Sequence, residues 1–138
     1  MSKGFELPAH YLPLQEQARQ LAADCADIAD RVDEASHIDP EIRSRLAKSR
    51  LAEVMVPAKF GGRYTEVDSL AATVVREALG YESAHLDSVF AMQGIGSYAI
   101  SASGSDQVRR TWLPRVAAME AVAALALTEP GVGYRFVA

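Results

Sequence analysis

The chain has 138 residues and a formal net charge of −4, and it is 49% hydrophobic and 23% charged. This length and balance predict one soluble globular domain and exclude an intrinsically disordered chain. No stripe of basic residues could follow a phosphate backbone, and the longest apolar run is far shorter than the roughly 20 residues that span a bilayer, so neither nucleic acid nor a membrane is an expected partner.

The N-terminal sequence "MSKGFELPAH" lacks the apolar stretch of a secretory signal, which favours a cytoplasmic protein. The single cysteine, Cys25, has no partner for a disulfide within the chain and falls on an apolar helix face. A structural role is therefore favoured over a reactive thiol. The three histidines show no spacing typical of metal ligands, and no metal site is predicted.

Two helices are predicted in the first third of the chain. The first spans Leu14 to about Ala35, because its apolar residues recur at alternating spacings of four and three. These residues are Leu14, Ala18, Leu21, Cys25, Ile28 and Val32. The second helix begins after Asp39, which suits an N-cap, with Pro40 in its first position, and it runs to about Lys48.

A loop and a third helix follow. Pro57 and the pair Gly61-Gly62 interrupt the helical periodicity and predict an ordered loop. The third helix is expected to start near Thr65 and to end at Gly80 in the left-handed conformation.

The fourth helix is the most apolar, and it is predicted from roughly Ser83 to Ser103, with Gly104 as its terminator. Gly94 and Gly96 lie inside it, although an interior glycine costs about 1 kcal/mol relative to alanine. Tight packing of another helix or room for a flat ligand would each explain them.

The chain closes with a fifth helix and a strand. Ser105 is the expected N-cap, Val108 and Trp112 are expected on the inner side, and Pro114 is expected to weaken the helix. The run from Val122 to Thr128 reads as a strand that requires a sheet outside this chain. Together these elements predict an all-α bundle of five to six helices with one short C-terminal strand.

Several motifs occur in a fixed order along this chain. They are "PAKFGG" from Pro57, "EALG" ending at Gly80, "GSDQ" from Gly104 with "LP" at Leu113-Pro114, and "LTEPG" from Leu127. Each motif is weak alone, but their joint order closely resembles the acyl-CoA dehydrogenase family, from about Leu14 to Gly133. The resemblance implies residues 1–120 as a helical N-terminal domain, 121–133 as the first strand and "TEPG" motif of a middle β-domain, and 134–138 as a tail that departs from the family.

The resemblance implies an FAD-dependent enzyme in which an acyl-CoA thioester loses an α-hydrogen as a proton and a β-hydrogen as hydride. The segment before "TEP" would lie beside the flavin ring, which makes Leu125, Leu127, Thr128 and Gly133 the candidate cofactor-binding residues. An aliphatic wall with a few backbone donors suits a flat, largely apolar ring.

The resemblance also implies that the acyl chain passes between the fourth and fifth helices. The candidate substrate-binding residues are then Phe90, Met92, Gln93 and Ile95, and the alternative is that they are ordinary core residues. Arg109-Arg110 could contact a CoA phosphate, but such a pair is usually a solvated helix face.

No catalytic residue is assigned, because the family supplies the proton-abstracting carboxylate from a C-terminal domain beyond this sequence. Glu129 is interpreted as a loop residue before a proline turn. The expected function is the N-terminal part of an acyl-CoA dehydrogenase, truncated and not catalytic alone. The alternative is a non-catalytic helical binding or oligomerisation module. In either case the apolar surface predicts a homo-oligomer.

Overall fold

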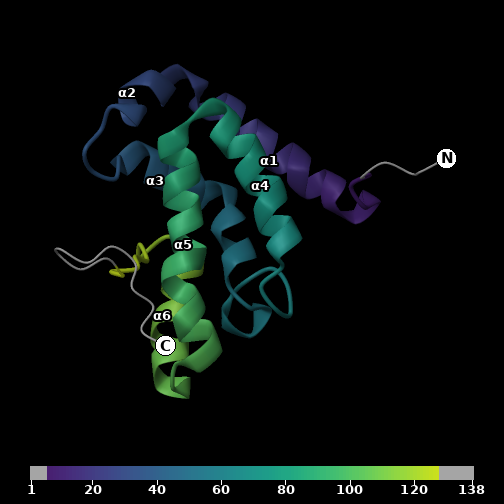
Figure 1. Cartoon of the computed structure of the whole chain (residues 1–138), viewed down its shortest axis with the longest axis vertical. Coiled ribbons are helices and arrows are strands. Elements are labelled where there is room, and N and C mark those ends of the chain that lie inside the picture. The colour runs from purple at the N-terminus through teal and green to yellow at the C-terminus, as the bar shows by residue number, and fades with distance from the viewer. Residues whose placement is uncertain (1–5, 128–138) are drawn as a thin grey trace.

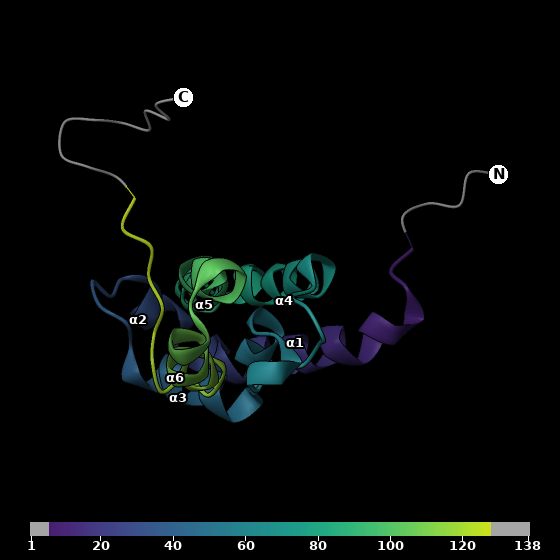
Figure 2. The same ribbon diagram turned by 90° about the horizontal axis from the view of Figure 1, so that it is seen from below.

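The computed structural model describes residues 6–127, and within this range the protein is an all-α bundle in two layers. Figure 2 shows α4 and α5 side by side in one layer, above a second layer that contains α1, α3 and α6. The six α-helices, in chain order in Figure 1, are α1 (Leu12–Cys25), α2 (Ala29–Asp33), α3 (Pro40–Ser49), α4 (Ser69–Glu82), α5 (Ala84–Ser103) and α6 (Asp106–Ala117). The expected fold class is confirmed.

Short polar side chains fix where the helices begin. The Asp39 carboxylate accepts hydrogen bonds from the amides of Glu41 and Ile42, so α3 starts as predicted. Asp68 caps α4 in the same way, which starts that helix at Ser69 and not near Thr65. Ser83 and Ser105 cap α5 and α6.

The first predicted helix is broken into two. After α1 the chain tightens into a 3-10 turn, Ala26–Ile28, before α2 begins. All six residues of the predicted apolar stripe are nevertheless buried. A 3-10 turn changes the helical pitch only locally, so the stripe still faces one side.

The sequence predicted that Gly80 would end this helix. The prediction is wrong, because α4 continues through Gly80 to Glu82. The chain then turns at Ser83, which is extended and serves as the cap of α5. A side chain at Gly80 would come no closer than 3.6 Å to Asp87, so nothing in the packing requires glycine here.

Helix α6 also departs from expectation, because it runs through Pro114 to Ala117. Its buried residues are Leu113, Val116 and Ala117, whereas the predicted inward residues Val108 and Trp112 are exposed. Trp112 lies instead beneath the Arg115 guanidinium, 4.9 Å from the ring centroid. The apolar spacing of α6 allowed two faces, and packing selected the one that includes Leu113.

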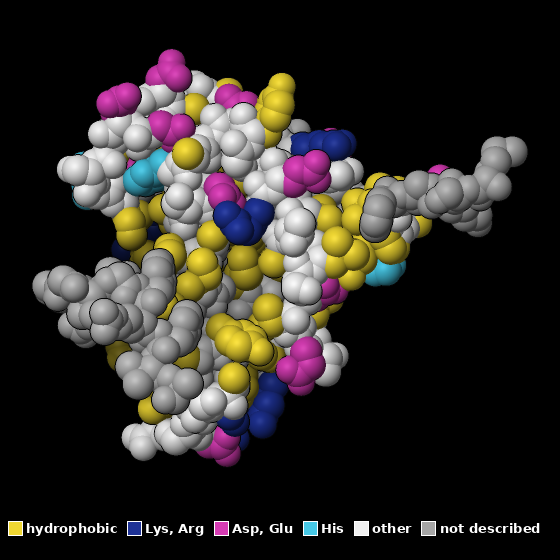
Figure 3. Space-filling view, in the orientation of Figure 1, with side chains coloured by type: hydrophobic (Ala, Val, Ile, Leu, Met, Phe, Trp, Pro, Cys, Tyr) yellow, Lys and Arg dark blue, Asp and Glu magenta, His cyan; other side chains and the backbone are white. Residues whose placement is uncertain are grey.

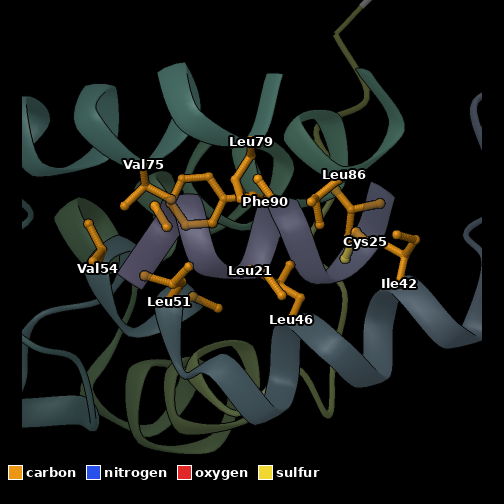
Figure 4. Close-up of a cluster of buried hydrophobic side chains, with 14 of the residues drawn as sticks. Leu21, Cys25, Ile42, Leu46, Leu51, Val54, Val75, Leu79, Leu86 and Phe90 are labelled. Atoms are coloured by element: carbon orange, nitrogen blue, oxygen red, sulfur yellow. The ribbon is translucent and has the colours of Figure 1, made fainter. Parts of the chain in front are cut away.

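The main core fills the space between the two layers, as Figure 4 shows. Phe90, Leu86 and Leu79 point down from the α4–α5 layer, and Leu21 and Leu46 meet them from α1 and α3. A smaller cluster joins α6, through Leu113, Val116 and Ala117, to Val56 and Phe60.

The chain leaves α6 through a segment that we call the exit segment, residues 118–127. It turns at Met119, which has a positive φ of 59°, and rises along the side of α5 to the outer surface (Figure 2). Within the described residues, 122–127 are neither helical nor paired in a sheet, so the predicted strand is not observed as a strand. Its last residue, Thr128, lies outside the described range.

Across residues 6–127, no helix combines the length and the apolar character needed to cross a membrane.

Candidate functional site

The outer face of α5 is the most unusual surface of the bundle. After Asp87 this helix carries no charged side chain, and Figure 3 shows hydrophobic side chains gathered over the α4–α5 face. Ile95 is 50% exposed there, and Tyr98 is more exposed still. A helix that is apolar on all sides is normally covered on all sides, so this face is suited to contact an apolar group.

Two open hollows flank α5. One, of about 670 Å³, lies between α5 and α4 and is lined by Met55, Val67, Ser69, Ala72, Thr73, Arg76, Ala91, Gly94, Ile95 and Tyr98. The other, of about 430 Å³, lies between α5, the loop 35–38 and the exit segment, and it includes His37, His85, Ser88 and Met92. Both fall within the usual size range of small-molecule sites.

The predicted substrate-binding residues divide between the outside and the inside of the bundle. Met92 and Ile95 line the two hollows, one on each side of α5. Phe90 and Gln93 are fully buried on the inner side of α5. In this structure only Met92 and Ile95 are placed to touch a ligand directly.

The Gln93 amide is saturated by hydrogen bonds to the chain after α6. Its Nε2 donates to the carbonyl oxygens of Val116 and Ala121, each at 3.0 Å, and lies 3.0 Å from the Met119 Sδ. Its Oε1 accepts from the Ala123 amide at 2.7 Å. A buried amide satisfied in this way is a structural connector, and no local sequence pattern indicates it because its partners lie 23 to 30 residues away.

The two interior glycines of α5 have different reasons. A Cβ at Gly94 would lie 2.6 Å from the Met55 Sδ, and a Cβ at Gly96 would lie 2.7 Å from the Ala123 carbonyl carbon. Both glycines therefore admit close packing of this chain's own segments, although the segment over Gly96 is the exit segment and not another helix.

The predicted cofactor-binding residues lie in or beyond the exit segment. Leu125 is 47% exposed and Leu127 is 56% exposed. Among the described residues, the backbone groups of 124–127 make no hydrogen bonds. Thr128 and Gly133, like Glu129, lie outside the described range.

The charged groups near α5 are engaged with one another. Arg76 of α4 forms two hydrogen bonds to Asp87, at 2.9 and 2.7 Å, and these bonds raise the pKa of Arg76. On the other side, the His85 Nε2 accepts a hydrogen bond from the Asp39 amide. Burial alone would raise the pKa of Asp39, but hydrogen bonds from Arg31 and from two amides outweigh it and lower that pKa.

Two other sequence candidates have structural roles. The Arg109 guanidinium donates to the carbonyl oxygens of Ile100 and Ala102, so it satisfies the C-terminal end of α5. Cys25 is fully buried, and its burial raises the pKa of the thiol, which agrees with the structural role predicted for it.

Arg43 also holds the exit segment, and the sequence did not predict this role. From α3, its Nε donates to the Met119 carbonyl oxygen at 2.9 Å and its Nη2 to the Glu120 carbonyl oxygen at 2.7 Å. The partners are more than 70 residues apart along the chain, so no local pattern announces the contact.

Residues 9–120 match the family model for the acyl-CoA dehydrogenase N-terminal domain. The chain is 30% identical to a probable acyl-CoA dehydrogenase, fadE25, of Mycobacterium leprae, over 94% of this chain and 33% of that protein. It is 30% identical to the cyclohexane-1-carbonyl-CoA dehydrogenase of Geobacter metallireducens (86% and 31%) and 29% identical to a 3-(aryl)acrylate reductase of Clostridium sporogenes (86% and 32%). The chain thus spans about a third of the length of these curated relatives.

Proposed function

Because the chain belongs to the acyl-CoA dehydrogenase family, we propose that it is the N-terminal helical part of an FAD-dependent acyl-CoA dehydrogenase. In this role it supplies one wall of the acyl-chain site and one flank of the flavin site, and it does not turn over substrate alone. We also propose the division predicted from the sequence, with residues 1–120 as the helical domain, 121–133 as the start of a second domain, and 134–138 as a separate tail.

The observation that carries this proposal is the uncharged outer face of α5 beside the exit segment. Met92 and Ile95 offer flexible and branched apolar surface to an acyl chain. Phe90 supports that face from the core, and Gln93 acts on the exit segment and not on the substrate.

The described part of the exit segment fits a flavin in two respects. Leu125 and Leu127 present aliphatic side chains, and the backbone of 124–127 has donors and acceptors free of partners among the described residues. A flat ring with polar edge atoms requires both features. When bound, FAD would accept the hydride that leaves the β-carbon of the acyl thioester.

The proton-abstracting base is expected from outside the described residues. Asp87 is the carboxylate nearest along α5 to its apolar face, but it is held by two hydrogen bonds from Arg76. Both oxygens of the Asp87 carboxylate are therefore already occupied by the Arg76 guanidinium. The role of this chain would be to orient the acyl group and to exclude water from it.

A second candidate function is a non-catalytic binding or oligomerisation module. The observation that favours it is the same exposed face, because half-exposed Ile95 and the more exposed Tyr98 could equally be covered by another copy of the chain.

Ligand titration of the purified chain separates the two functions. Saturable quenching of FAD fluorescence and calorimetric binding of straight-chain acyl-CoAs are expected. Affinity should rise with chain length by up to about 0.8 kcal/mol per CH₂ that becomes buried, while free CoA shows no such trend. Ile95→Asp should remove the dependence on length.

Val108→Asp is the matched control, because Val108 is exposed on α6 and lies away from both hollows. It should retain the length dependence. A chain that ignores FAD and binds CoA and acyl-CoA equally would refute the enzymatic proposal, and a stable dimer with those properties would favour the module.

A further inference from the structure

We propose that Gln93 is a positioning residue that fixes the path of the exit segment and thereby sets where the flavin flank lies. This inference rests on the proposed function for its consequence, but its geometric part stands on contacts within the described chain. Gln93 itself is too deeply buried to touch a cofactor.

The Gln93 side chain holds the end of α6 and two positions of the exit segment at once. Its side chain leaves the middle of α5 and reaches the last turn of α6 at Val116, then Ala121, then Ala123. The bond to Ala123 is the last hydrogen bond of the exit segment among the described residues. Beyond that point the direction of the chain depends on what holds Ala123.

Only a glutamine-like side chain supplies this set of bonds. The amide gives two donor hydrogens and an acceptor oxygen at the end of a three-atom reach. Glutamate would bring an acceptor without the two donors, and methionine would fill the same space with neither. Each replacement would remove a partner from the part-buried Ala121 carbonyl or Ala123 amide, whereas the Val116 carbonyl keeps the Met119 amide.

Gly96 and Arg43 complete the arrangement. The backbone at Ala123 and Ala124 crosses α5 directly over Gly96, closely enough that a Cβ would lie 2.8 Å from the Ala123 Cβ. Arg43 holds the carbonyl oxygens of Met119 and Glu120 from the α3 side. The exit segment is therefore fastened on both sides before it reaches Leu125.

The register at Ala123 matters because successive side chains of an extended chain point to opposite sides. A slip of one residue at the Gln93 contact would exchange the directions of Leu125 and its neighbours. In the proposed site, this would replace leucine side chains with alanine at the flavin flank.

The first test is amide hydrogen exchange on the 138-residue chain, measured for Gln93→Met. We expect exchange at Ala121 and Ala123 to accelerate about tenfold to a hundredfold, while the amides of α1 and α4 keep their protection. Leu86→Met is the matched control, because Leu86 is also a fully buried α5 residue but makes no bond to the exit segment. Unchanged exchange at Ala123 in Gln93→Met would overturn the proposal.

The second variant, Gly96→Ala, keeps Gln93 and blocks the crossing. It should accelerate exchange at the Ala123 amide in the same assay even if Gln93→Met fails to fold. Gly80→Ala, at an interior helix position with a nearest contact of 3.6 Å, should leave the exit segment unchanged. Normal protection of Ala123 in Gly96→Ala would contradict the crossing.

FAD fluorescence quenching then tests the consequence. We expect at least a tenfold loss of FAD affinity in Gln93→Met and Gly96→Ala, and none in Leu86→Met and Gly80→Ala. If the exit segment loosens but FAD affinity equals that of the unmodified chain, Gln93 is merely structural and the positioning role is refuted. If the unmodified chain binds no FAD, the proposed function fails, and the exchange data still decide the role of Gln93 in the path of the chain.

Discussion

Individual residues at neighbouring positions of α5 have different roles. Phe90 and Gln93 are fully buried, whereas Ile95, two residues after Gln93, is half-exposed. The family resemblance grouped these residues with Met92 as one candidate site, because it implies that the acyl chain passes between the fourth and fifth predicted helices. Burial separates them into a core aromatic ring, a connector and two surface residues.

Truncation of Phe90 and of Ile95 should therefore differ in cost. Phe90→Ala should lower the free energy of unfolding by about 3–5 kcal/mol, because it leaves a cavity between the two layers. In the monomer, at protein concentrations below self-association, Ile95→Ala should lower it by no more than about 0.5 kcal/mol, as is usual for a surface position. Urea denaturation at neutral pH measures both, and equal losses would contradict the assignment of Ile95 to a free surface.

At the element scale, α4 is anchored to the start of the chain. The Tyr11 hydroxyl donates to the Asp68 carboxylate at 2.6 Å, and the same carboxylate caps α4 through the amides of Leu70 and Ala71. The hydrogen bond from Tyr11 is the main cause that lowers the pKa of Asp68, and it raises the pKa of Tyr11.

This pair predicts a stability contribution with two pH limits. Asp68 has a folded pKa below its ordinary value of 3.8, so its contribution is present above that value and is lost as the pH falls through the folded pKa. Tyr11 has a folded pKa above its ordinary value of 10.0, so its contribution is present below that value and is lost as the pH rises through the folded pKa.

Tyr11→Phe isolates the contribution. The stability difference between the native chain and this variant should be largest between about pH 5 and pH 9 and should shrink toward both extremes, as measured by urea denaturation across the pH range. Tyr81→Phe is the control, because the Tyr81 side chain is almost fully exposed and makes no side-chain hydrogen bond among the described residues. A constant difference across pH would show that the pair is not coupled in solution.

In the molecule as a whole, the space between the two helical layers is filled by a core, but the apolar outer face of α5 is left exposed. That outer face has the composition of an interior surface. We expect this face to be covered, either by further parts of an enzyme or by a second copy of the chain.

Self-association through this face can be tested directly. The chain alone should form a homo-oligomer, and Ile95→Glu should convert it to a monomer, because a buried unpaired carboxylate is unfavourable. Light scattering after size exclusion at several concentrations measures the mass. Trp112→Glu is the control, since Trp112 is exposed on α6. A chain that stays monomeric at high concentration would count against the expected oligomer.

Much of the fold was determined by the sequence itself. The stripe from Leu14 to Val32 was predicted completely, and Asp39, Ser83 and Ser105 gave three helix starts, because apolar periodicity and capping act over four or fewer residues. The prediction failed where the local sequence was compatible with two different structures. Gly80 could end a helix or continue it, and α6 could turn either Trp112 or Leu113 inward.

Tertiary structure alone decided the candidate site. Whether Gln93 faces a ligand or the exit segment depends on chain 23 to 30 residues away, and the role of Arg43 depends on a carbonyl group 76 residues away. The motif order identified the family, but it contained no information on which side chains are saturated by hydrogen bonds. Such contacts are set by how the layers pack, which no short segment specifies by itself.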